Sequence, residues 1–307
     1  MYQQESLNIL EFQERFGSDD ACRDHLFRIR WSAGLVCPKC GGKVFYKIKS
    51  RNIYECSCRH QVSLTAGTIM HRSRTPLTKW FMAIYLVAKD SRGVPALQLM
   101  KELNVSYPTA WSMLHKIRRA MGAMENQYQL AGIVEMVAIN VGASMEARKR
   151  NQNHRTDKTQ VQAALSLDDQ GNPECVKMEK LDTLAGKSTR DFVVRYIKAG
   201  AVIRTDLGSL DAKGMASQPY IHESADLNVR GKTERWERIN QVADNAKRII
   251  FGTYHGLGAK HLQAYLDEFC FRFNQRRFPE PIFNLLLNAC MLATPITYFE
   301  IVSQMEA

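Results

Sequence analysis

The chain has 307 residues, a length that suits about two domains and a sizeable core. Its formal net charge of +11 favours a polyanionic partner, either nucleic acid or an anionic membrane surface. The sequence has no apolar run near the roughly 18 residues that span a bilayer, and its start lacks the pattern of a signal peptide. The predicted partner is therefore nucleic acid, with no membrane, and the predicted location is cytoplasmic.

The N-terminal segment predicts a pair of helices. Apolar residues such as Leu10, Phe12 and Phe16 recur at helical spacing, and Ser18-Asp-Asp begins a second helix. We interpret residues 1–33 as a helical cap that packs on the segment after it.

Four of the eight cysteines form a tight cluster, which is typical of a metal site in a reducing compartment rather than of a disulfide framework. Two cysteine pairs flank a hairpin-forming stretch, and residues 34–72 are therefore predicted to be a zinc ribbon that holds a structural Zn²⁺. The predicted ligands are Cys37, Cys40, Cys56 and Cys58.

The second cysteine pair has the spacing C-x-C, where C-x-x-C is usual. Either its turn is tighter or His60 replaces one cysteine, and a chance cluster of free thiols is the remaining alternative. Four thiolates close the coordination sphere and leave no position for water, which argues against a zinc-dependent nuclease.

Residues 73–122 predict a DNA-binding region. An apolar-faced helix is expected over 76–88, and the following residues predict a helix, a short turn at Asn104-Val-Ser and a second helix, the helix-turn-helix pattern. The start of the second helix would face a major groove, and its later cations would meet phosphates. The residues expected to contact DNA are Ser106, Tyr107, Thr109, Lys116, Arg118 and Arg119. Helical hairpins without a DNA function share this pattern, but the basic charge favours DNA.

A second domain is predicted over 130–277, followed by a C-terminal helix within 278–307. The pattern predicts strands at 130–142, 160–167 and 175–181, a helix at 188–198, a strand at 201–206, and helices at 234–251, 259–275 and 281–292, the last of the chain. Residues 207–232 receive no assignment. Three strands, a helix and a fourth strand are the order of a ribonuclease H-like domain, so the predicted fold class is α/β with small N-terminal domains.

The run Ala201-Val-Ile-Arg-Thr-Asp206 is β-branched and ends on a carboxylate. This pattern favours a buried strand that delivers a metal ligand at its carboxyl end. The alternative is an Asp that only begins a turn.

Longer motifs across nearly the whole chain resemble bacterial insertion-sequence transposases of the ISXO type. They are Cys37-Pro-Lys-Cys40-Gly, Gln61-Val-Ser-Leu-Thr-Ala-Gly-Thr-Ile-Met-His, Pro76-Leu-Thr-Lys-Trp-Phe, Lys247-Arg248 followed by Gly252-Thr-Tyr-His, and Lys260-His-Leu-Gln-Ala-Tyr-Leu-Asp-Glu-Phe. The resemblance implies a zinc ribbon, a helix-turn-helix and a DDE-type integrase core. It also implies Mg²⁺- or Mn²⁺-dependent cleavage and joining of double-stranded DNA, at element terminal repeats and a target, by a homo-oligomer associated with the nucleoid.

The resemblance places the three metal-binding positions of such a core at Val137, Asp206 and Asn240. It also places Lys247 against DNA near the active site. A site with one Asp and one neutral Asn lacks the anionic oxygens that hold Mg²⁺ beside phosphate. We therefore interpret the catalytic site as degraded at Val137 and Asn240, with Asp206 as the remaining magnesium ligand.

Two alternatives stay open. A relocated metal site could use Glu135, which strand alternation puts on the same face as Val137, or Glu237, which shares a helix face with Asn240. The other alternative is a non-catalytic, sequence-specific DNA-binding protein derived from a transposase.

Overall fold

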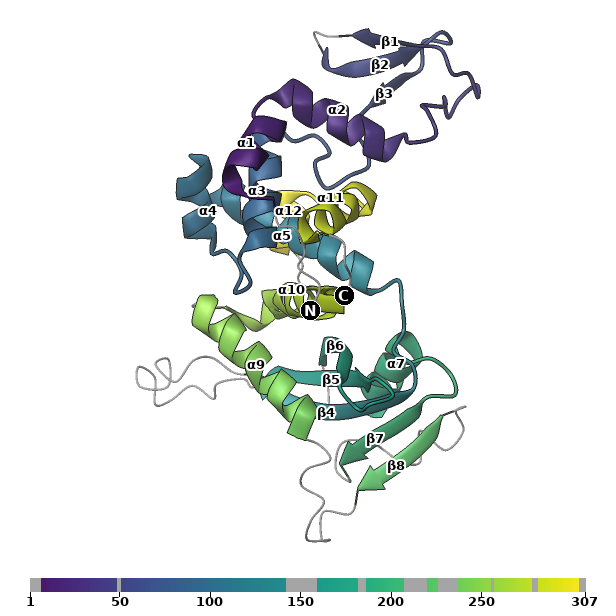
Figure 1. The fold of residues 1–307 in the computed structure, drawn as a ribbon, viewed down its shortest axis with the longest axis vertical. Helices are drawn as coiled ribbons and strands as arrows, with labels where there is room; N and C mark the ends of the chain where they lie inside the picture. The colour runs from purple at the N-terminus through teal and green to yellow at the C-terminus, as the bar shows by residue number, and fades with distance from the viewer. Residues whose placement is uncertain are drawn as a thin grey trace. The chain divides into compact units, whose positions relative to one another are not determined.

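The computed structural model describes residues 7–48, 51–141, 159–181, 186–206, 220–225, 237–254, 257–277 and 281–303. The chain divides into two compact units, Met1–Ala120 with Pro279–Ala307, and Met121–Phe278. Figure 1 shows the elements of both units. None of the described helices is long and apolar enough to cross a membrane.

The first unit contains a small sheet and helices from both ends of the chain. Its elements are α1 (Ile9–Phe16), α2 (Asp19–Arg30), β1 (Phe45–Ile48), β2 (Ile53–Cys56), β3 (Gln61–Ser63), α3 (Leu77–Lys89), α4 (Ala96–Leu103), α5 (Tyr107–Glu125, whose end falls in the second unit), α11 (Ile282–Leu292) and α12 (Tyr298–Ser303). The predicted N-terminal helix pair and hairpin are confirmed. The prediction that 281–292 is the last helix is wrong, because α12 follows it.

Aromatic side chains hold the helices of the first unit together. The N-cap Asn8 starts α1 with a reciprocal capping box to Glu11. Phe12 then stacks on Tyr85 of α3 with ring centroids 4.4 Å apart, and it meets the edge of Phe283 of α11 at 5.7 Å. The C-terminal helix α11 thus completes the core of the N-terminal unit. Beside this core, β1, β2 and β3 form an antiparallel sheet in that order.

The second unit is built on a five-stranded mixed sheet. Its elements are β4 (Ile133–Val141), β5 (Thr159–Leu167), β6 (Pro173–Leu181), α7 (Gly186–Tyr196), β7 (Val202–Asp206), β8 (Ile221–Ala225), α9 (Glu237–Thr253), the 3-10 turn η3 (Ala259–His261), α10 (Leu262–Asn274) and the 3-10 turn η4 (Gln275–Arg277). The strand order is β6-β5-β4-β7-β8. Strands β4, β5 and β6 are antiparallel, β7 runs parallel to β4, and β8 runs parallel to β7.

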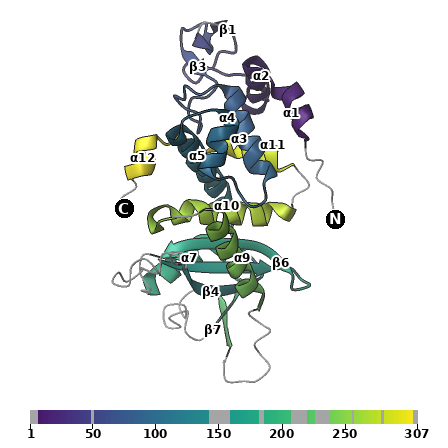
Figure 2. The same ribbon diagram turned by 90° about the vertical axis from the view of Figure 1, so that its left-hand side faces the viewer.

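Helices cover both faces of this sheet. Alternate residues of β4 and β5, such as Ile139 and Val161, pack with Ile239 of α9 and with α10 in one apolar cluster. The intervening residues, such as Val134, pack with Phe192 of α7 in a second cluster. Figure 2 shows α9 crossing the strands. The sheet is therefore the middle layer of the second unit.

A buried polar network joins the end of α5 to β6 and α10 within the second unit. Lys177 Nζ lies 3.1 Å from Glu125 Oε2, and both side chains are less than 5% exposed (3% and 4%). The same ammonium group lies 3.5 Å from the ring centroid of Tyr128. Asn274 Nδ2 donates to Glu125 Oε2 at 2.6 Å and to the Tyr128 hydroxyl at 2.8 Å. The Glu125 carboxylate is thus compensated by one cation and several hydrogen bonds.

Candidate functional site

Four cysteine sulfurs of the ribbon converge on one point. All four lie within 4.8 Å of one another, and Cys37–Cys58 and Cys40–Cys56 are each separated by 3.6 Å. Tetrahedral zinc with bonds of about 2.3 Å would separate its sulfurs by about 3.8 Å. The donor set therefore fits a structural Zn²⁺. The fourth ligand of this group is Cys58 and not His60. Of the two predictions for the second cysteine pair, the tighter turn is therefore the one that the structure shows.

Glycines close the first cysteine turn. Gly41 adopts a φ of 70°, and its N–H donates to the Cys37 carbonyl at 2.9 Å. A Cβ on Gly42 would lie 3.2 Å from Cys40 Sγ, so the close approach to the sulfurs favours glycine at this position.

The second turn closes in the same way with one residue fewer. The Cys56 N–H donates to the His60 carbonyl at 2.9 Å, and the Arg59 N–H donates to the Cys56 carbonyl at 2.7 Å. Arg59 takes the left-handed conformation, with a φ of 66°, at the place of the glycine in the first turn. The backbone N–H of Cys58 also bonds the Cys56 sulfur and lowers its pKa to about 6. The tighter turn therefore accommodates the C-x-C spacing.

Helices α4 and α5 are joined by the short turn that the sequence predicts. Asn104 ends α4 in the left-handed conformation, with a φ of 46°. The Ser106 hydroxyl then lies 2.9 Å from the Thr109 hydroxyl and accepts the Thr109 N–H at 3.4 Å, which starts α5. Leu103 and Leu114 are both buried. The start of α5 is thus fixed in direction by its own caps and by the core.

Five of the six residues predicted to contact DNA lie at least partly on the surface of α5. Ser106, Tyr107 and Arg119 are exposed, while Thr109 and Lys116 are half-buried. The sixth residue, Arg118, differs from the prediction, because it is buried, with only 3% of the residue exposed, and does not offer its side chain to DNA. Its position explains the burial: Leu114 and Met121, four residues before and three after, are also buried on that helix face.

The helix α12, which the sequence did not predict, lies against the same face of α5. Tyr298 packs edge-on against Trp111 with centroids 5.8 Å apart, and Arg119 donates to the Thr294 hydroxyl at 3.3 Å. The pKa of Glu300 is lowered, first by hydrogen bonding to Thr297 and then by the charges of Arg119 and Lys116. The Glu300 carboxylate thus lies close to Lys116 and Arg119, the two accessible cations that were predicted to contact DNA phosphates.

Two of the predicted catalytic positions, Val137 and Asp206, lie on adjacent strands of the second unit, and the third, Asn240, lies on α9. Val137, on the central strand β4, is half-buried and packs against the cluster that contains α9. Met136 of β4 pairs with Thr205 of β7, so Val137 and Asp206 directly follow the last paired positions on adjacent strands. Asn240 is exposed in the first turn of α9. Position 137 holds a side chain that offers no metal ligand.

Glu135 is buried at the start of α9. Only 3% of the residue is exposed, and burial raises the pKa of its carboxyl group, opposed by a hydrogen bond from the Ile239 N–H and by the charges of Arg238 and Arg204. One carboxylate oxygen, Oε2, has no hydrogen-bond partner among the described residues. A buried carboxylate at a helix N-terminus stabilises that terminus, so Glu135 anchors α9 to β4.

The other predicted residues of α9 lie on its outer side. Glu237, the first residue of the helix, is exposed, and Lys247 Nζ is 3.2 Å from Asp244 Oδ1. Within the described ranges, the four cysteines are the only group of three or more potential metal ligands close enough to share an ion. With neutral side chains at 137 and 240, the residues of the predicted catalytic site do not fit two divalent ions.

Comparison with known families agrees with the sequence motifs. Residues 129–274 match the ISXO2-like transposase domain, and residues 17–61 match the transposase zinc-ribbon domain. Both segments of the chain are thus similar to domains of insertion-sequence transposases of this type, and the resemblance drawn from its motifs is confirmed.

Two individual proteins are similar to parts of the chain. One is an uncharacterized protein in transposable element ISH50 of Halobacterium salinarum, 29% identical over 145 residues. That alignment covers 46% of this chain and 48% of the relative, so the chain spans about half the length of the relative. The other is the cryo-EM structure of the simian T-cell lymphotropic virus intasome in complex with PP2A regulatory subunit B56 gamma. It aligns with a TM-score of 0.30 and 14% identity, over 57% of this chain and 63% of that one, a likeness too distant to carry an argument.

Proposed function

We propose that this protein is a DNA-binding transposase of an insertion sequence whose strand cleavage is impaired. The observation that carries the proposal is Val137, which lies half-buried in an apolar cluster at the first predicted metal position. The family domains support descent from an active transposase. The neutral residue at this position supports the loss of its metal chemistry.

The sheet supports a ribonuclease H-like domain as the scaffold. Three antiparallel strands are followed by α7 and by two strands parallel to the first, in the spatial order β6-β5-β4-β7-β8. In such a domain β4, the end of β7 and α9 would carry the acids that share two metal ions. Position 206 supplies one acid, whereas Val137 and Asn240 supply none. A site with so little negative charge would hold divalent ions poorly beside a phosphodiester.

The first unit supplies the proposed DNA-binding function. The net charge of +11, the zinc ribbon and the capped α4–α5 pair support binding to element terminal repeats as a homo-oligomer. Tyr107 and Thr109 at the start of α5 would reach base edges, while Lys116 and Arg119 would contact phosphates. The negative charge of Glu300 on α12 interacts with Lys116 and Arg119. Glu300 would therefore compete with DNA phosphates for these two cations.

Two substitutions with opposite effects test this assignment. Arg119→Ala is expected to lower the slope of log affinity against log salt concentration by about one unit, because one phosphate contact is lost. Glu300→Gln is expected to raise the affinity for DNA roughly threefold at low salt. The substitution removes a negative charge that repels the phosphates, and salt screens this repulsion only weakly at low ionic strength. Fluorescence anisotropy with duplexes that carry the flanking repeats measures both quantities.

The exposed Lys198 of the second unit provides a control of equal charge. Lys198→Ala should leave the slope within experimental error of the wild type. If Arg119→Ala behaves like Lys198→Ala, α5 does not contact phosphates and the DNA-binding surface lies elsewhere.

A further inference from the structure

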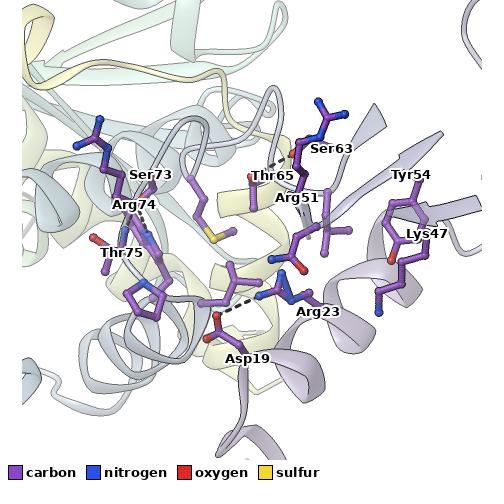
Figure 3. A pocket seen from close by; sticks show the side chains of 16 residues that line it. Asp19, Arg23, Lys47, Arg51, Tyr54, Ser63, Thr65, Ser73, Arg74 and Thr75 are labelled. Carbon is purple, nitrogen blue, oxygen red and sulfur yellow. Dashed lines mark hydrogen bonds and ion pairs between the residues drawn. The ribbon is translucent and has the colours of Figure 1, made fainter. Parts of the chain in front are cut away.

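A cavity of about 350 Å³ lies in the first unit, and none of the residues predicted to contact DNA lines it. It is enclosed by α2, by β1 and β2 of the ribbon, by β3 with the residue pair after it, and by the segment that leads into α3 (Figure 3). Its lining residues are Asp19, Arg23, Lys47, Arg51, Asn52, Tyr54, Ser63, Leu64, Thr65, Met70, Ser73, Arg74, Thr75, Pro76, Leu77 and Trp80.

Positive charge dominates the cavity. Figure 3 shows Arg74 on one side, Lys47 on the opposite side, and Arg23 with Asp19 between them. Asp19 is the only carboxylate in the lining. It is already bound to Arg23 at 3.2 Å and to the Thr78 N–H at 3.0 Å. Within the described part of the chain Lys47, Arg51 and Arg74 form no ion pair, so three cations remain to meet an anion.

One buried donor of Arg23 also lacks a hydrogen-bond acceptor. Its Nε atom is buried and makes no hydrogen bond among the described residues, and the nearest carboxylate oxygen, on Asp20, is 3.7 Å away. An unsatisfied buried donor is costly. Because this atom is shielded from solvent, the ligand contacts of the cavity come from the accessible cations and not from Arg23 Nε.

The walls are held in place without a ligand. The Arg30 guanidinium donates to the carbonyls of Ser63 at 3.3 Å and Ala66 at 2.6 Å, and also to the Leu64 carbonyl. Trp80 Nε1 donates to the Ser73 hydroxyl at 2.9 Å. A preformed cavity binds its ligand with a smaller entropic cost than one that must be ordered on binding.

The floor of the cavity is apolar. Leu64, Met70, Leu77 and Trp80 are all buried, and the Tyr54 ring stands at the side. A free phosphate would use the cations and leave this floor unused, whereas a nucleotide would use both. A volume of about 350 Å³ is in the range of small-molecule sites.

We propose that this cavity binds one unpaired nucleotide of a DNA strand, with its base on the apolar floor and the backbone phosphates on either side of that nucleotide near the rim cations Lys47, Arg51 and Arg74. The inference rests on the proposed DNA-binding function and adds a preference for single-stranded ends or extruded bases. Aromatic and apolar contacts with an unstacked base combine with backbone cations in many proteins that bind single strands.

The test compares two DNAs of the same sequence, a blunt duplex and a duplex with a short single-stranded overhang that carries 2-aminopurine. Full-length protein is expected to bind the overhang DNA roughly tenfold more tightly, as one base contact predicts, and to raise the 2-aminopurine fluorescence. The pocket variant Arg51→Ala/Arg74→Ala is expected to lose both effects.

A control variant removes two positive charges, as the pocket variant does, from ribbon residues outside the cavity. Lys39 and Lys43 are exposed and do not line it, so Lys39→Ala/Lys43→Ala should keep the overhang preference. Equal binding of both DNAs by wild-type protein overturns the inference while the proposed function stands. A preference that survives in the pocket variant also overturns it. Failure to bind either DNA overturns the proposed function and the inference together.

Discussion

Replacing Cys37 with serine is expected to release the zinc ion and unfold the ribbon. Structural zinc contributes about 10–16 kcal/mol of apparent binding free energy in small zinc domains. The sheet of the ribbon has little core of its own, because its strands are of 4, 4 and 3 residues and most of their side chains are partly or fully exposed; Arg30 of α2 adds hydrogen bonds only at the end of the ribbon, to Ser63, Leu64 and Ala66. The loss of one thiolate therefore removes most of the free energy that keeps this sheet folded.

The measurement is the zinc content of purified protein by elemental analysis, together with amide hydrogen exchange over residues 34–72. Cys22→Ala is the matched control, since Cys22 is buried in the same unit and lies outside the cluster. The control should retain one zinc ion per chain and a protected ribbon. Unchanged zinc content in Cys37→Ser would contradict the four-thiolate site.

The second large effect is expected at the buried ion pair of the second unit. Lys177→Met removes the cation 3.1 Å from Glu125 and leaves the carboxylate in a site that is 4% exposed. Breaking such a pair on one side costs about 3–5 kcal/mol, because the remaining charge is uncompensated. The free energy of unfolding from denaturant titration should fall by that amount.

A double variant separates the charge effect from a packing effect. Glu125→Gln/Lys177→Met removes both charges, and the glutamine can still accept from the Asn274 and Tyr128 donors that bond Glu125. It is expected to recover most of the lost stability. Lys198→Met, at an exposed position, should stay within about 0.5 kcal/mol of the wild type. A loss below 1 kcal/mol in Lys177→Met would show that the pair is not isolated from solvent.

The sequence predicts the elements that carry a clear apolar period, and it misses β3, β8 and α12, which do not. β8 begins with Ile221, its single large apolar residue, which is 59% exposed. An edge strand of this kind has no buried face to impose an alternating pattern. α12 is only 6 residues long, although Thr297 and Glu300 form a reciprocal cap that the spacing T-x-x-E signals.

The two sites of the first unit differ in how far they can be predicted. The zinc ligands lie in short local motifs, so spacing identifies the site, and only the choice between Cys58 and His60 needs the folded chain. The cations of the cavity come from α2, the ribbon and the segment before α3, and no local pattern links Arg23 with Arg51 or Arg74. Only the folded chain brings them together. The same holds for Glu300, which reaches α5 from the other end of the chain.

The most direct test of impaired cleavage is Mg²⁺- or Mn²⁺-dependent nicking of labelled DNA that carries the flanking repeats. Wild-type protein is compared with Val137→Asp/Asn240→Glu, which places a carboxylate at the first metal position and at the third, where the family resemblance implies Glu in many relatives and His or Asn in others. We expect the wild type to bind the DNA without cutting it and the variant to nick it at the repeat. Metal-dependent nicking by the wild type would contradict the account, and would mean that a metal site has been rebuilt around Asp206 with other ligands.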